Sequence, residues 1–379
     1  DQLPTTTTYF RNTPYTTAHH AHELLFGVTR ADGRSKPAAA ELERFARLVG
    51  RLDLKEYALP EPEAYLVVPS HNSAWRYPFW SPDTSATQGV LLEAWVLSKQ
   101  AHLPIGMLRE RGLVEGEAED DGDTLPLPGT ARLLILPHCQ ALLASSYQRL
   151  LEFARVGGVV YHSYHVDPSI DLFEELFGCA HGLRYGLAER TEDEIDITFL
   201  TNVGAIHEGE KLSYRRAGQT RRSSYCPVTP LTAEVVATDS AGRPALLVNR
   251  VGRGAVVFSA YPLEYYLWSG DDVHVTDQTH RLYAALGQLA GIRPPFQVDN
   301  PQVEVGWFEG SHDYFVWLIN HDWEAQPVNL EAAGRDLTDA ETGTRADTRM
   351  LLPAKGVRVL SAKLAPSEME ASRAAKPEE

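Results

Sequence analysis

The chain has 379 residues, of which 43% are hydrophobic and 23% are charged, and its formal net charge is −16 at pH 7. A chain of this length predicts two or three domains, and this composition is typical of globular proteins that bury substantial cores. The excess of acidic residues argues against nucleic acids and anionic membranes as partners, because their phosphates attract basic protein surfaces.

The cysteine pattern and the hydropathy argue against zinc centres, disulfide frameworks and membrane spans. The three cysteines, Cys139, Cys179 and Cys226, are widely spaced and form no CxxC motif. This spacing favours a reducing, cytoplasmic compartment. No uncharged apolar stretch reaches the roughly 18 residues that a membrane helix needs, and the first residues show no signal-peptide pattern.

The N-terminal part is predicted to hold a loop and one helix. Polar, Thr-rich residues 1–17 indicate the loop, and the helix is predicted over 38–49, after Pro37 and before Gly50. Because an isolated helix of this length is marginal in water, its apolar face predicts a packing partner that the adjacent sequence does not supply. That face carries Leu42, Phe45, Ala46 and Val49.

Between residues 65 and 177 short apolar runs alternate with helical patterns, which predicts βαβ units and a parallel sheet. Strands are predicted at 65–68, 104–108, 132–136 and 159–162. Helices are predicted at 87–100, 145–156 and 170–177.

The C-terminal half is richer in strand patterns. Residues 195–259 are predicted to be β-rich, with a hairpin turn at 239–242, and a helix is predicted over 277–291. After a linker at Pro294-Pro295, apolar and polar residues alternate over 296–361, which predicts a small antiparallel sandwich or open barrel. The polar tail, 362–379, is predicted to be disordered.

Three groups of motifs, in this order, carry a resemblance to a clan A glycoside hydrolase. The first resembles the end of a catalytic (β/α)8 barrel: Pro14-Tyr15, Glu23-Leu24-Leu25-Phe26-Gly27, Asp32-Gly33 and Lys36-Pro37. The second resembles the trimerisation domain of family-42-type β-galactosidases, which has a class I glutamine amidotransferase-like, flavodoxin-like fold: Gly157-Gly158-Val159-Val160 and Gly252–Phe258. The last segment is similar to the small β domain that closes such enzymes.

The resemblance therefore implies an α/β protein in four segments. Residues 1–58 would be the end of the barrel with its last helix, and 59–293 the flavodoxin-like domain. Residues 294–361 would be the small antiparallel β domain, and 362–379 the tail. It further implies a β-glycoside substrate such as a galactoside or mannoside, a homo-oligomer that is a trimer or dimer, and an N-terminal barrel on the same or a separate chain.

The resemblance also implies that the catalytic residues are missing. Retaining barrel glycosidases place an acid/base Glu and a nucleophile Glu roughly 5 Å apart at the ends of two strands. In the resembling enzymes those strands precede the final one, and this chain begins after them. It is expected to be inactive alone, to need no cofactor, and to contribute to assembly and to the border of the active site.

The candidate substrate-binding residues lie on loops. Trp75, Arg76 and Trp80 form an aromatic loop with one cation, which either stacks on sugar or anchors a subunit interface. His165 and Asp167 follow the strand at 159–162 and would lie at the carboxyl edge of the sheet. With His162 they have a weak metal-like spacing, and we expect no metal. Glu23 is either a subsite contact or a structural carboxylate.

Two other function classes remain open at this stage. One is a stand-alone carbohydrate-binding or assembly module. The other is an amidotransferase-like hydrolase with a degenerate triad, in which Ser163 would replace the family's Cys nucleophile. Where that family has a His-Pro-Glu triplet, this chain reads Tyr261-Pro262-Leu263-Glu264, so the His is absent.

Overall fold

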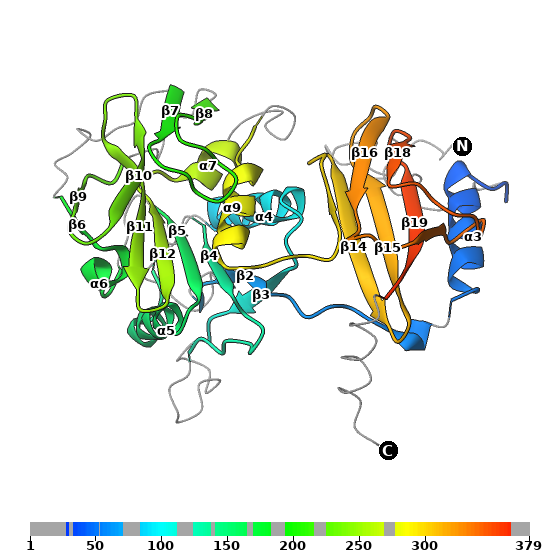
Figure 1. The fold of residues 1–379 in the computed structure, drawn as a ribbon, viewed down its shortest axis with the longest axis horizontal. Helices are drawn as coiled ribbons and strands as arrows, with labels where there is room; N and C mark the ends of the chain where they lie inside the picture. The colour runs from blue at the N-terminus through cyan, green and yellow to red at the C-terminus, as the bar shows by residue number, and fades with distance from the viewer. Residues whose placement is uncertain are drawn as a thin grey trace, which may run out of the picture.

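A computed structural model of the chain describes residues 28–29, 33–52, 54–70, 84–111, 124–137, 141–164, 170–182, 194–215, 225–268 and 277–364. It contains two bodies side by side (Figure 1). An α/β body surrounds a large sheet, and a β body holds the C-terminal strands with helix α3 on its outer side. The prediction of an α/β fold with additional antiparallel sheets is confirmed.

Five parallel strands form one half of a nine-stranded sheet, in the order β3-β2-β4-β5-β12. Numbered along the chain, this is the order 2-1-3-4-5 that is common in doubly wound α/β proteins. Short apolar runs form such strands because both faces are covered, and every residue of β4 and β5 is buried. The strands are β2 (Ala64–Val68), β3 (Ile105–Arg109), β4 (Leu133–Leu136), β5 (Val159–Ser163) and β12 (Gly254–Ser259).

Four antiparallel strands continue the same sheet beyond β12, in the order β11-β10-β7-β8. The predicted turn joins β10 to β11: the Asp239 carboxylate accepts the N–H groups of Ala241 and Arg243, and Gly242 has a φ of +79°. The strands are β7 (Glu194–Phe199), β8 (Lys211–Arg215), β10 (Glu234–Asp239) and β11 (Pro244–Val251). A separate ladder pairs β6 (Cys179–His181) with β9 (Val228–Pro230).

Within the described ranges, five helices pack on the large sheet around one continuous apolar core. Helix α4 contacts α7 and α9, α5 contacts β5 and β12, and α6 contacts β11 and β12. They are α4 (Thr84–Gln100), α5 (Ala144–Arg155), α6 (Phe173–Phe177), α7 (Leu263–Trp268) and α9 (His280–Leu289). Helix α7 was not predicted from the sequence. No helix in the described ranges has both the length and the apolar character needed to cross a membrane.

The β body is a sandwich of two antiparallel sheets, β1-β14-β15-β19-β17 and β13-β16-β18, around a second apolar core. Its strands are β1 (Tyr57–Ala58), β13 (Gln297–Val298), β14 (Val303–Gly310), β15 (Asp313–Asn320), β16 (Gln326–Glu331), β17 (Leu337–Asp339), β18 (Arg349–Leu352) and β19 (Val357–Lys363).

The N-terminal helix of the described chain belongs to this β body. Helix α3 (Pro37–Val49) is followed by a short 3-10 helix (Leu54–Glu56) and by β1, which pairs with β14. Leu48 of α3 is buried against Phe315 and Val359 of the outer sheet face. The sequence predicted this helix but not this partner, because the partner lies more than 260 residues further along the chain.

The α/β body and the β body meet where α4 ends. His102, just after α4, has a left-handed φ of +56°, and its imidazole is hydrogen-bonded to the backbone of Val298. Lys99 Nζ lies 3.2 Å from a carboxylate oxygen of Glu304 on β14. Burial, followed by the nearby His280, lowers the pKa of His102 to about 4. The imidazole is therefore neutral in the folded protein at neutral pH.

Candidate functional site

The carboxyl edge of the parallel strands is the usual ligand position in an open α/β sheet. Strands β5 and β12 end here side by side, at the paired residues Ser163 and Ser259. Helix α7 begins a few residues after β12 and brings Glu264 to this edge. The nucleophile and the carboxylate of a degenerate amidotransferase triad would lie at these positions.

Three hydroxyl groups hold the Glu264 carboxylate. Ser163 Oγ donates to Oε2 at 2.5 Å, and the Tyr161 and Tyr283 hydroxyls each donate to Oε1 at 2.9 Å. Glu264 and Ser163 are fully buried. Burial raises the pKa of Glu264, and the three donors oppose that rise because they favour the charged form. The group is a closed polar cluster inside the core, and a buried hydroxyl of this kind offers no access to a substrate.

The side chains of His162 and Tyr261, the two other residues considered for amidotransferase-like chemistry, are also buried. His162 is 1% exposed, and its ring packs against Phe177 and Phe258 at centroid distances of 5.2 and 6.0 Å. The Tyr261 hydroxyl donates to Asp239 at 2.7 Å. Both side chains are therefore enclosed in the core.

A second acidic residue stands near the cluster and makes stability depend on pH. Glu93 on α4 is 6% exposed; burial, followed by the charges of Asp277 and Glu264, raises its pKa to about 8. Because the folded state holds this proton more tightly than the unfolded chain, the stabilisation is complete below about pH 4.5 and is lost as the pH rises through 8.

Glutamine has no proton to lose, so the stability of Glu93→Gln should not fall in this way. We expect its free energy of unfolding, measured relative to that of the unmutated protein, to rise by about 1–3 kcal/mol from pH 5 to pH 8.5. Urea unfolding at both pH values measures the difference. A difference that stays constant with pH would show that Glu93 titrates normally.

A large apolar recess lies elsewhere, between α3 and the outer face of the β body. It has a volume of about 840 Å³. In an antiparallel sheet the outer face is ordinarily polar, but here β15 carries apolar side chains on both faces. On the helix, Leu42 is 53% and Phe45 62% exposed. The apolar side chains along the recess are Ala38, Leu42, Phe45, Leu48, Val49, Leu52, Phe308, Phe315, Trp317, Ile319, Val357 and Val359.

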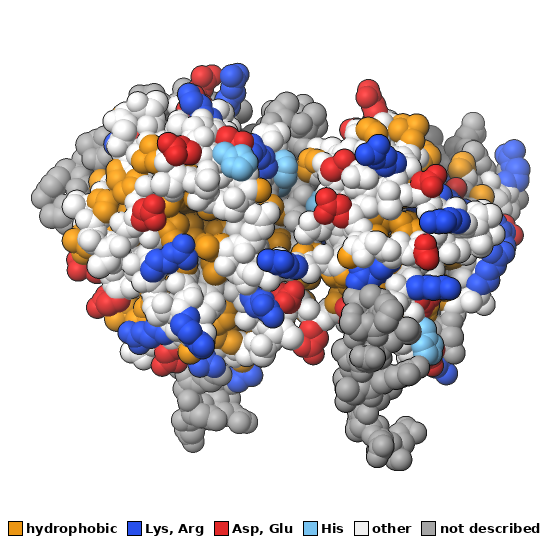
Figure 2. Space-filling view, viewed as in Figure 1, with side chains coloured by type: hydrophobic (Ala, Val, Ile, Leu, Met, Phe, Trp, Pro, Cys, Tyr) orange, Lys and Arg blue, Asp and Glu red, His pale blue; other side chains and the backbone are white. Residues whose placement is uncertain are grey.

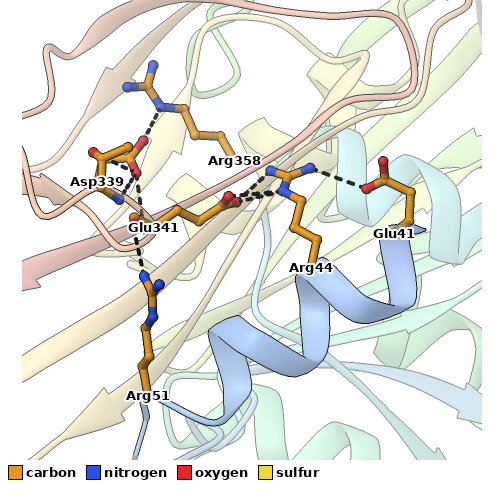
Figure 3. Close-up of polar contacts among 7 residues, drawn as sticks. Glu41, Arg44, Arg51, Asp339, Glu341 and Arg358 are labelled. Carbon is orange, nitrogen blue, oxygen red and sulfur yellow. Dashed lines mark hydrogen bonds and ion pairs between the residues drawn. The ribbon is translucent and has the colours of Figure 1, made fainter. Parts of the chain in front are cut away.

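Charged groups fasten α3 along one rim of this recess (Figure 3). The Arg44 guanidinium donates to both carboxylate oxygens of Glu341, at 2.5 to 3.1 Å, and to Glu41 at 3.3 Å. Arg51 donates to the backbone carbonyl of Glu341 at 2.9 Å. These bonds from Arg44 lower the pKa of Glu341. The helix is thus held at a defined position while its apolar face stays exposed.

The face of the molecule in Figure 2 shows acidic and basic side chains interspersed over both bodies. The net charge of −16 is therefore not gathered into a single acidic surface there. Such a mixed surface neither attracts nor repels a charged ligand strongly.

All six sequence-predicted substrate-binding residues lie outside the described residues: Glu23, Trp75, Arg76, Trp80, His165 and Asp167. Of the residues considered for altered chemistry, Ser163 and Glu264 are brought together, while His162 and Tyr261 take part in other contacts. Sequence reasoning missed Tyr283 and the Arg44–Glu341 pair, since each joins segments far apart in the chain. Within the described ranges no group of three or more metal-ligating side chains is assembled.

Comparison with known proteins shows structural similarity but no sequence match. No protein-family model matches the sequence, and no curated protein matches it. Among solved structures, β-galactosidases from Bacillus circulans sp. alkalophilus and Rahnella sp. R3 are similar, at 17% and 14% identity with TM-scores of 0.62 and 0.65. A catalytic mutant of Gan42B, a GH42 β-galactosidase from G. stearothermophilus, has 16% identity and a TM-score of 0.62.

The likeness is one of fold. It covers 89% of this chain in all three comparisons. The chain spans about half the length of these solved structures, 47% of the first and 46% of the others. Both bodies of the chain thus occur together in enzymes that hydrolyse β-galactosides.

Proposed function

We propose that this chain is the C-terminal part of a glycoside hydrolase that acts on β-linked sugars such as β-galactosides or β-mannosides. It works with a (β/α)8 barrel, on the same or a separate polypeptide, that supplies the catalytic glutamate pair. This chain serves oligomer assembly and borders the active site. The support is the fold shared with β-galactosidases over 89% of the chain, together with a length that is about half of theirs.

The exposed apolar face of α3 is the single observation that best supports a barrel partner. Leu42 and Phe45 are more than half exposed beside a recess of about 840 Å³. At about 25 cal/mol per Å², covering two such side chains stabilises a complex by on the order of 2–4 kcal/mol. We propose that α3 is the last helix of the barrel, and that residues 1–58 complete that domain.

The α/β body is proposed to be a flavodoxin-like assembly domain of the class I glutamine amidotransferase type, over residues 59–293. Its parallel strands have the order expected of that type. The loop with Trp75, Arg76 and Trp80 is proposed to border the barrel's active site, with Glu23, His165 and Asp167 as further contacts. A dimer or trimer would bring such a loop to a neighbouring subunit.

The decisive experiment compares two proteins on nitrophenyl β-D-galactoside and β-D-mannoside. One is this chain alone, and the other extends it with the polypeptide encoded directly upstream of Asp1. We expect hydrolysis by the longer protein only. Turnover by residues 1–379 alone, or an upstream region without a barrel, would contradict the proposal.

A negative charge placed on the apolar face of α3 should disrupt the proposed contact between this chain and the barrel. In the longer protein, Phe45→Glu should lower the melting temperature and reduce activity at least about tenfold, because a buried unpaired carboxylate costs several kcal/mol. In this chain alone the same change should be nearly neutral, since Phe45 is 62% exposed. The matched control is Arg47→Glu on the same helix, whose side chain is 59% exposed and lies outside the recess. Equal effects of both changes in the longer protein would contradict docking through this face.

A further inference from the structure

Trp323 is the most exposed large apolar side chain in the described part of the molecule, with 81% of its surface accessible to solvent. It lies in the loop between β15 and β16, on the β body. An indole of this size is ordinarily largely buried, since it is among the residues that gain most from leaving water. Its exposure therefore calls for a physical reason.

The loop that carries Trp323 is rigidly constructed. The buried Asn320 side chain accepts the N–H of Asp322 at 2.8 Å and donates to the carbonyls of Glu324 and Pro353, both at 2.8 Å. The Gln326 amide donates to the Asp322 carboxylate. These bonds fix both ends of the loop to the strands, so that the indole is held outward by the backbone and does not swing with a flexible loop.

A second loop supports the ring itself. Lys355 has a left-handed φ of +51°, a conformation that glycine adopts more easily. Its backbone N–H donates to the carbonyl of Asp322, and its Nζ donates to the carbonyl of His321. The ammonium lies 4.2 Å from the centroid of the Trp323 ring. A cation thus covers part of the indole, while the rest stays open to solvent.

We propose that Trp323 is a stacking platform for a pyranose ring of a β-linked galactan or mannan, separate from the active site supplied by the barrel. The choice of a β-linked sugar rests on the proposed function. A pyranose has one face of C–H groups that stacks on an indole, and hydroxyl groups at its rim. The platform can match both, because the open part of the indole can take the C–H face, while the Lys355 ammonium at the ring and the carboxylates of Asp322 and Glu324, next to Trp323 in the chain, can bond the hydroxyls.

The polar surroundings favour a sugar over a protein partner. The centre of a protein–protein interface is a well-packed apolar patch in which charged residues are depleted. Trp323 is instead a single ring among charged and polar neighbours. A subunit contact through this ring is therefore the competing outcome of the test.

The test is electrophoresis of the full 379-residue chain through native gels that contain β-1,4-galactan, β-1,4-mannan or no polysaccharide. We expect at least one polysaccharide to retard the protein. Trp323→Ala should weaken this binding by at least about threefold, as the loss of one aromatic stacking contact predicts, and Trp323→Phe should keep most of it. The matched control is Leu351→Ala, which removes another apolar side chain that is 65% exposed on the same body.

A second variant tests whether Lys355 contributes to sugar binding, or whether the exposure of Trp323 alone is enough. Lys355→Gly removes the cation and relieves the left-handed backbone, so the protein should stay folded by circular dichroism while retardation weakens. The inference is overturned if neither polysaccharide retards the unmutated protein, or if Trp323→Ala binds as well as Leu351→Ala. It is equally overturned if Trp323→Ala changes the oligomeric state in light scattering and leaves retardation unchanged, which would assign the ring to a subunit contact.

The binding test and the hydrolysis test fail independently. Retardation through Trp323 together with an inactive longer protein would remove the proposed glycosidase function and leave the sugar platform. Hydrolysis by the longer protein without any retardation of this chain would remove the sugar platform and leave the proposed glycosidase function.

Discussion

Replacing Gly254 with alanine should destabilise the protein by about 3–5 kcal/mol, the range of severe overpacking and backbone displacement. A Cβ at this position would lie 2.0 Å from the carbonyl oxygen of Gly158 and 2.5 Å from that of Ala154. Both atoms belong to the backbone where α5 ends and β5 begins, so no side chain can move aside. Strand β12 must approach that turn closely, because Ala255 N–H donates to the Gly158 carbonyl at 3.2 Å.

Thermal or urea unfolding of Gly254→Ala measures this cost, with Gly129→Ala as the matched control. At Gly129 an added Cβ would meet nothing within 4 Å, and its φ is not in the left-handed region. We expect the control to change stability by less than about 1 kcal/mol. If the two variants unfolded alike, the close approach of β12 to the α5–β5 turn would be refuted.

Replacing Glu264 with leucine should also cost about 3–5 kcal/mol, since the hydroxyls of Ser163, Tyr161 and Tyr283 would lose their shared acceptor inside the core. Glu264→Gln keeps one acceptor oxygen in nearly the same volume and should cost less, about 1–2 kcal/mol. Urea unfolding of the two variants near pH 7 measures the difference.

The triple change Glu264→Leu, Tyr161→Phe and Tyr283→Phe provides the control. Removing two of the three donors together with their acceptor should restore part of the stability that Glu264→Leu loses, because the two tyrosine hydroxyls are then no longer present in the core. A triple variant less stable than Glu264→Leu would show that the hydroxyls are satisfied by other groups and that Glu264 is not their principal partner.

Local sequence patterns predicted most of the large sheet. The runs at 65–68, 132–136 and 159–162 became β2, β4 and β5, because three or four consecutive apolar residues suit a strand that is covered on both faces. The turn at 239–242 was predicted for a similarly local reason, the affinity of Asp and Gly for tight turns. Helix α7 was missed because its six residues are too short for a helical period to show.

The candidate sites were much less predictable. The Arg44–Glu341 pair joins residues 297 apart, and the Glu264 cluster joins β5, α7 and α9, so that neither leaves a pattern in any local window. The aromatic loop at 75–80, which lies outside the described residues, is predicted from its composition, whereas Trp323 is one indole without a neighbouring aromatic in the sequence. Its importance depends on exposure and on Lys355, and both are set by the folded loops.

The packing of α3 on the outer sheet of the β body also affects how the chain folds during synthesis. The helix leaves the ribosome long before Glu341 is made. Glu341 is the ion-pair partner of Arg44 and lies 297 residues after it in the chain. At the usual speed of translation this delay is roughly 15–60 s. During that time the apolar face with Leu42 and Phe45 lacks the sheet on which α3 finally rests, while the α/β body can fold. Chaperones, or a domain made earlier, would protect the nascent chain from aggregation in this interval.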